Sequence, residues 1–218
     1  MAATPLVPLR VFRSRALSGA AVAGSCLGAV TFSMWFLLTL YLQRVLGLSP
    51  VQAGLAFAPI SLAVVVSTRL GSRLSSELGP GRVLAAGMAV LGLGMLLQAR
   101  VGTDASWARD LLLPSLLCAA GIGCSFVPAT IAATSGVAVE DSGLASGVLN
   151  TAYQAGSSLD LALLATIAAD GFAGAFLAGA LIAFAGSAVA LVVVGEPVAV
   201  RHRGGLRARA RAQLGQDP

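Results

Sequence analysis

Residues 16–43 read ALSGAAVAGSCLGAVTFSMWFLLTLYLQ, and no charged residue lies between Arg15 and Arg44. A helix that crosses the hydrocarbon core of a bilayer needs roughly 20 mostly apolar residues. This stretch is long enough to cross once, and it is too long for the apolar core of a secretory signal peptide. It therefore predicts a membrane-spanning helix near the start of the chain.

The composition of the whole chain indicates the same environment. Of the 218 residues, 57% are hydrophobic and 11% are charged, and the mean hydropathy is +0.88. Because a soluble domain carries about a quarter charged residues, most of this surface is expected to face lipid. The three cysteines lie inside apolar stretches without metal-ligand spacing. They predict neither a disulfide framework nor a structural zinc site.

Charged residues and turns divide the chain into six apolar segments. None of them alternates with the two-residue period of a barrel strand, so each predicts a helix. The predicted fold class is an all-α membrane protein with six transmembrane helices. The expected organisation is a cytoplasmic N-terminal segment (1–15), a six-span domain (16–195, with spans at 16–43, 45–68, 83–100, 110–135, 142–169 and 171–195) and a basic cytoplasmic tail (196–218).

The arginines predict the orientation in the membrane. If the N-terminus is cytoplasmic, only Arg44, Arg100 and Arg109 of the fourteen basic residues fall on the outer side. Positive residues in short loops favour the cytoplasmic side, so we expect a multi-pass membrane protein with both termini inside. The basic tail is interpreted as a topology anchor, although binding of anionic lipid is also compatible with it. A nucleic-acid partner is not expected, because no aromatic or folded module accompanies the basic run.

The fifth segment carries more polar residues than its surroundings predict. Residues 142–162 read SGLASGVLNTAYQAGSSLDLA. On a helix, steps of four, three, four and three bring five residues onto one face, with Gln154 beside them: Ser146, Asn150, Tyr153, Ser157 and Asp160. Such a face either bonds to neighbouring helices or lines a water-accessible cavity. For the serines and amides the sequence supports both alternatives equally.

Asp160 is a separate case, because an acid within a span is a candidate functional site. It lies ten residues before Asp170, toward the outer end of its helix, and no arginine inside the six segments is available to pair with it. The alternatives are a partly hydrated or protonated acid and a dedicated proton carrier.

Four segments together resemble a known family. They are PLVPLRVFRSRAL (5–17), LTLYLQRVLGLSPVQAGLAFAP (38–59), LLPSLLCAAGIGCSFVP (112–128) and VEDSGLASGVLNTAYQAGSSLDLALLATIA (139–168). These segments resemble the drug:proton antiporters with fourteen spans, within the major facilitator superfamily. The likeness runs over residues 5–194 and is with the last six spans, the C-terminal domain of such a transporter.

The resemblance implies alternating access, in which two six-helix domains rock around a central cavity. Proton entry drives export of small apolar or cationic compounds, and no cofactor is implied beyond the proton gradient. The implied partners are the lipid bilayer, the substrates and an N-terminal transporter half. The first, second, fourth and fifth helices are expected to line the cavity or the domain interface, and the third and sixth to face lipid.

The sequence departs from the family pattern at several positions. Tyr153 stands where the family usually has an arginine, and Asp160 where it usually has a small residue. The hypothesis for Asp160 is that it attracts cationic substrate when the cavity opens outward. The segment SRLSSELGPGR (72–82) resembles the superfamily's loop motif through Arg73, Gly79 and Arg82, but serines replace its acid and its first glycine. The main proton-coupling acids of the family lie in the N-terminal half, so this chain alone is not expected to complete the cycle.

Three classes of function follow from these observations. The first is a (multi)drug exporter, present as a C-terminal half, a truncated form or one subunit of a split transporter. The alternative is a six-span scaffold or regulatory module, or a homodimer with its own pathway. An enzyme is not expected: the sole histidine, His202, lies in the tail, and no nucleophile–base pair or metal cluster is evident. No catalytic residue and no metal ligand is predicted.

Overall fold

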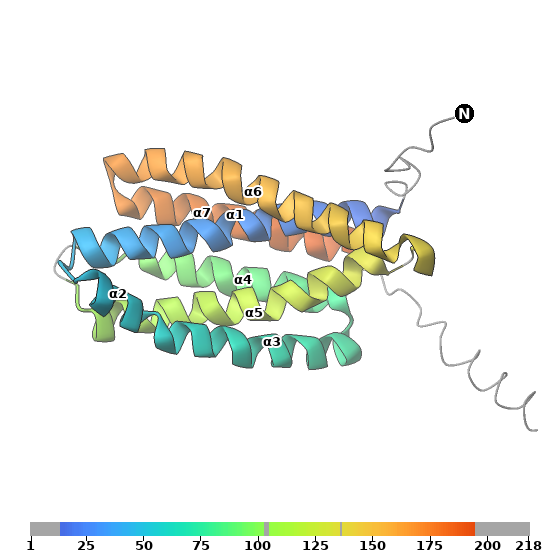
Figure 1. The fold of residues 1–218 in the computed structure, drawn as a ribbon, viewed down its shortest axis with the longest axis horizontal. Helices are drawn as coiled ribbons and strands as arrows, with labels where there is room; N and C mark the ends of the chain where they lie inside the picture. Colours follow the sequence, from blue (N-terminus) through green and yellow to red (C-terminus); the bar gives the residue numbers. More distant parts are fainter. Residues whose placement is uncertain (1–13, 103–104, 136, 195–218) are drawn as a thin grey trace, which may run out of the picture.

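Long apolar helices lie side by side along one axis (Figure 1) in the computed structural model, which describes residues 14–102, 105–135 and 137–194. The elements of this described part are α1 (Arg15–Arg44), α2 (Pro50–Ala56), α3 (Ala58–Leu78), α4 (Pro80–Gln98), η2 (Trp107–Leu111), α5 (Leu112–Thr134), η3 (Val139–Asp141), α6 (Ser142–Asp170), α7 (Phe172–Val189) and η4 (Ala190–Val194). The predicted all-α membrane fold is confirmed. The expected tail, 196–218, and nearly all of the expected N-terminal segment lie outside the described residues.

The helix α1 contains the charge-free stretch 16–43, which is the first apolar segment of the sequence. The Ser14 hydroxyl accepts a hydrogen bond from the Leu17 amide at 3.3 Å, which satisfies one of the free N–H groups of the first turn. Arg44 lies in the last turn, where a positive charge complements the helix dipole. Because α1 packs against α5, α6 and α7, it is a central element of the bundle.

Five of the long helices described are apolar enough to cross a membrane: α1, α2 with α3, α4, η2 with α5, and α7 with η4. The remaining one, α6, has 29 residues, or about 43 Å at 1.5 Å per residue, so its length also suffices. Its polar residues, however, leave it outside the set that hydropathy selects. To lie stably in the membrane, α6 therefore depends on contacts with neighbouring helices more than the other five spans do.

The second helix differs from the predicted segment 45–68. Ser49 and Gln52 form a capping box, and Pro50 occupies the first turn, so α2 begins five residues later than expected. After a break at Phe57, α3 continues past the exposed Arg69 as far as Leu78. The helix thus extends beyond the predicted span, which ends before the first charged residue. An exposed arginine near a membrane surface does not end a helix.

Small residues determine which helices approach most closely. A Cβ at Gly28 of α1 would collide with the Tyr153 carbonyl of α6, and one at Gly156 would collide with the Ser25 carbonyl. In a membrane no hydrophobic effect drives helices together, so close backbone contact of this kind is a main source of attraction. The two glycines thus fix the crossing of α1 and α6.

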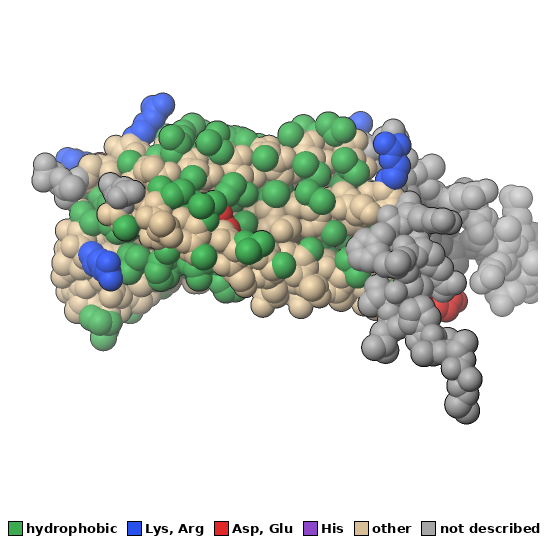
Figure 2. All heavy atoms as spheres, turned by 90° about the horizontal axis from the view of Figure 1, so that it is seen from above, with side chains coloured by type: hydrophobic (Ala, Val, Ile, Leu, Met, Phe, Trp, Pro, Cys, Tyr) green, Lys and Arg blue, Asp and Glu red, His purple; other side chains and the backbone are tan. Residues whose placement is uncertain are grey.

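The outer surface agrees with a membrane location. On the face seen in Figure 2, basic side chains lie toward the two ends of the bundle, while hydrophobic side chains are spread over the middle among backbone and other side chains, with an acidic group visible there. The helix α3 is the least buried of the candidate spans and exposes Leu62, Val65 and Val66. In this environment these residues face lipid or another membrane domain, not water.

Candidate functional site: the polar face of α6

The polar face of α6 is divided into two parts by its neighbours. Ser146, Asn150 and Tyr153 line a cavity of about 160 Å³ between α1, α5 and α6, and we call these three residues the cavity half. Ser157 and Asp160, which we call the buried half, are only 6% and 5% exposed. The two parts lie on one face of one helix, yet their surroundings differ completely.

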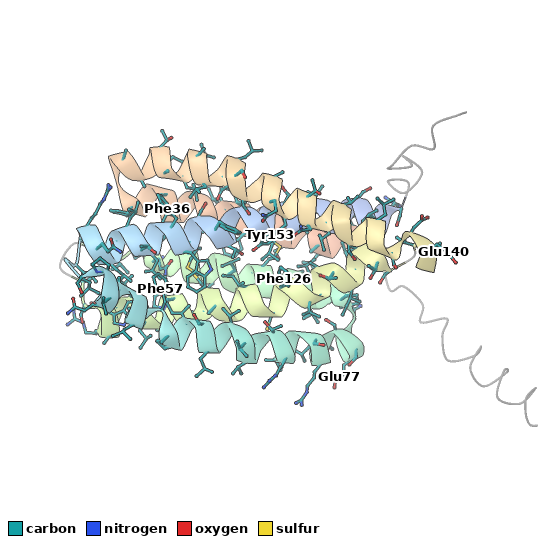
Figure 3. The ribbon with its side chains drawn as sticks, viewed as in Figure 1. Phe36, Phe57, Glu77, Phe126, Glu140 and Tyr153 are labelled. Atoms are coloured by element: carbon teal, nitrogen blue, oxygen red, sulfur yellow. The ribbon has the colours of Figure 1, made fainter. Side chains whose placement is uncertain are left out.

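Aromatic side chains form a wall of the cavity. The Tyr153 ring contacts Phe32 of α1 edge-on, with centroids 6.1 Å apart, and Phe126 of α5 at 5.9 Å. Figure 3 shows Tyr153 and Phe126 in the middle of the bundle, where α1, α5 and α6 meet. Gly24 and Thr130 contribute further lining from the two other helices. The cavity therefore combines aromatic rings with the Asn150 amide and the hydroxyl groups of Thr130, Ser146 and Tyr153.

Asn150, although it lines the cavity, is also exposed at the surface of the bundle, and so is Gln154. Gln154 does not belong to the cavity lining. These amides are the ninth and thirteenth of the 29 residues of α6, within a predicted span, where contact of a polar side chain with lipid is costly. Their exposure indicates that this face of the six-helix bundle meets water or another protein surface.

The buried half of the face turns toward α1. The Ser157 hydroxyl donates to the Tyr153 carbonyl at 2.8 Å within its own helix. Ser33 of α1 donates to Asp160 Oδ2 at 2.7 Å, and Asp160 Oδ1 is buried without a hydrogen-bond partner. Attraction of substrate by Asp160 stays a prediction for a state in which α1 and α6 separate, since the carboxyl is covered here.

The loop-motif residues lie at the junction of α3 and α4. Gly79 alone connects the two helices, with φ at +88°, a backbone conformation that favours glycine. Arg73 and Arg82 are exposed on either side of it. Arg82 also lines a second cavity, of about 300 Å³, whose other walls are apolar residues of α3, α4 and α5. The junction is far in sequence from the polar face of α6, and the cavity beside it shares no lining residue with the cavity at that face.

Sequence reasoning missed the residues that other helices contribute. Phe32, Ser33 and Phe126 each contact the polar face of α6, but none was singled out. The only signal was that Ser33 is one of a few polar residues within a mostly apolar span, which does not single it out. Within the part of the chain that the structure describes, no cluster of three or more metal-ligating side chains occurs.

A bundle of long apolar helices that encloses a cavity with a few polar residues in its lining is consistent with a membrane transport protein. The sequence matches the profile of the Major Facilitator Superfamily over residues 20–216, and the chain belongs to this superfamily. The superfamily is one of transporters and not of enzymes, in agreement with the sequence analysis.

Relatives within the superfamily carry names that refer to export and resistance. The chain is 37% identical to the cephamycin export protein CmcT of Amycolatopsis lactamdurans over 79% of its own length and 36% of the relative. It is 34% identical to the puromycin resistance protein of Streptomyces alboniger, over 80% and 35% of the two chains. The lincomycin resistance protein of Streptomyces lincolnensis is 33% identical over 76% and 34%. The chain thus spans about a third of the length of these relatives.

Proposed function

We propose that this chain is the C-terminal six-helix half of a fourteen-span drug:proton antiporter that exports small apolar or cationic compounds. The observation that carries the proposal is the cavity between α1, α5 and α6, with its aromatic wall and its amide. Apolar rings bind apolar compounds, and ring faces attract organic cations. Relatives named for the export of, or resistance to, antibiotics support a substrate class of this kind.

The other half of the pathway comes from further membrane helices. The cavity opens on a side where Asn150 and Gln154 are exposed, and the chain spans about a third of its relatives. A second six-helix domain covering this side would give the amides polar partners. Within the proposal, that domain is supplied by the rest of a longer protein or by a separate subunit.

The function is tested by a chimera in which this chain replaces the matching segment of the cephamycin export protein. We expect cells that lack related exporters to expel a cationic dye, such as ethidium, when they express the chimera. A protonophore should abolish the export, because the proton gradient drives it. The chain expressed alone should not export the dye.

Matched variants make this test specific to the cavity. Asn150→Leu should reduce export, whereas Leu159→Ala, a change at an exposed apolar side chain of the same helix, should not. A chimera that reaches the membrane and exports neither cationic nor neutral dyes would refute the proposal. That result would favour a six-span scaffold or regulatory module without transport of its own.

The proposed orientation places both ends of the chain in the cytoplasm. It is supported by the predominance of arginines in the segments assigned to the inner side. A reporter active only in the periplasm should work when fused at Gly102 and fail at Pro218. Equal activity at both positions would contradict this orientation.

A further inference from the structure

We propose that Asp160 and Ser33 form a proton-binding site that holds α1 and α6 together. Asp160 is 5% exposed and is the acid of the buried half of the α6 face. Ser33 donates to one carboxyl oxygen at 2.7 Å, and the other oxygen is buried without a partner. The carboxyl therefore receives one hydrogen bond, where an ionised carboxylate has room for about four.

Among the described residues of α6 and of the elements packed against it, no basic side chain lies near enough to balance an ionised Asp160. The basic residues of α1 are Arg15 and Arg44, eighteen and eleven residues from Ser33, or about 27 and 17 Å along the helix axis. The helix α1 also carries the Cys26 thiol, which is not cationic. An ionised acid here would be a buried charge without a counter-charge.

The elements packed against α6 do not change this balance. The helix α7 carries no titratable side chain. The other titratable groups on the packed elements are Tyr41 on α1, Cys118 and Cys124 on α5, Glu140 and Asp141 in η3, and Tyr153 and Asp170 on α6 itself. None of these is a base that is positively charged at neutral pH. A bound proton is the simplest way to remove the charge of Asp160.

The neutral acid suits the observed contacts better than the anion does. Its carbonyl oxygen accepts from Ser33, and only one O–H group is left without a partner, which costs less than a buried charge. The close crossing at Gly28 and Gly156 keeps α1 against α6 beside this site. If α1 and α6 separate, water reaches the carboxyl and the proton is released. The site thus couples protonation to the packing of two helices.

Infrared spectroscopy of the purified chain in detergent tests the site without any transport. At neutral pH the wild-type chain should show the carbonyl band of a protonated carboxylic acid that is absent from Asp160→Asn. In Ser33→Ala, which lacks the donated hydrogen bond that favours the anion, the band should persist to higher pH. Ser187→Ala is a matched control, since this buried serine on α7 donates to the Ala85 carbonyl and should leave the band unchanged.

Thermal unfolding gives a second measurement. Asp160 ionises freely in the unfolded chain, so the stability of the wild type relative to Asp160→Asn should fall as the pH rises. Identical infrared spectra of the wild type and Asp160→Asn at neutral pH would overturn the proposal. Loss of the band on adding sodium at constant pH would also overturn it, because the site would then bind a sodium ion in place of the proton. If Asp160→Asn does not fold, an unchanged band titration in Ser33→Ala would overturn it. A role of this site in transport rests on the proposed function. The proton-binding site itself does not, so a chimera that fails to export dye leaves the infrared result unaffected.

Discussion

The two halves of the polar face of α6 obey the same helical period and yet have opposite environments. Ser146, Asn150 and Tyr153 border a cavity, whereas Ser157 and Asp160 are covered by α1. The cause lies in the size of the residues where the helices cross. Gly28 and Gly156 let the backbones of α1 and α6 touch, while the Tyr153 and Phe126 rings hold α5 and α6 apart.

This comparison teaches that polarity alone does not mark a substrate site in a membrane bundle. Polar residues serve as contacts between helices where small residues surround them, and as cavity lining where large ones do. The relevant quantity is the space that the neighbouring helix leaves. The following substitutions test this explanation, beginning with the one of largest expected effect.

Gly156→Leu should disrupt the buried half. A side chain here meets the Ser25 backbone, which cannot move aside as a flexible side chain would. We expect the free energy of unfolding to fall by about 3 kcal/mol, the upper part of the usual range for overpacking. Thermal denaturation in detergent, followed by near-ultraviolet circular dichroism, measures the change.

The matched control is Gly147→Leu on the same helix. A Cβ at Gly147 meets no atom within 4 Å, so this variant should unfold at the wild-type temperature or slightly above it. If both variants lose the same stability, the size of the residues at the crossing does not explain the difference between the two halves.

Tyr153→Ala should have an intermediate effect, because it removes the ring that Phe32 and Phe126 contact. We expect a loss of about 2 kcal/mol, less than for a fully buried aromatic residue because Tyr153 is half-buried. Tyr153→Phe keeps the ring and should stay within about 0.5 kcal/mol of the wild type. A large loss in Tyr153→Phe would mean that the hydroxyl, and not the ring, maintains the cavity.

Asn150→Ala should leave stability almost unchanged, within about 0.5 kcal/mol, because the side chain is exposed. In the chimera with the cephamycin export protein it should lower dye export by about threefold, the weight of one neutral hydrogen bond. Gln154→Ala, which lies outside the cavity lining, serves for comparison. Equal losses of export in both variants would mean that export does not depend on this cavity.

Much of the fold follows from composition, because long segments without charge have few alternatives to a helix in lipid. The ends of the helices follow less well. The break at Phe57 and the late start of α2 depend on Ser49, Pro50 and Gln52, which are local signals inside an apolar run. The continuation of α3 to Leu78 depends on an arginine that stays exposed at its end of the bundle.

The candidate site is predictable only in part, since periodicity concerns one helix at a time. It places Ser146, Asn150, Tyr153, Ser157 and Asp160 on a common face, but it does not identify what covers them. Ser33 is one of several serines in α1, and only the crossing at Gly28 brings it to Asp160. Which part of the face becomes buried is a property of the pair of helices, not of either sequence segment.

The modest hydropathy of α6 also has a consequence for biogenesis. Helices enter the bilayer from the translocon according to their apolar character, and an acid near the helix centre is a substantial penalty. The hydroxyl that bonds to Asp160 belongs to a helix synthesised more than a hundred residues earlier. We therefore expect α6 to remain at the translocon until it packs against α1. Because α1, which carries the hydrogen-bond donor, is synthesised first, the order of synthesis assists membrane insertion of the most polar span.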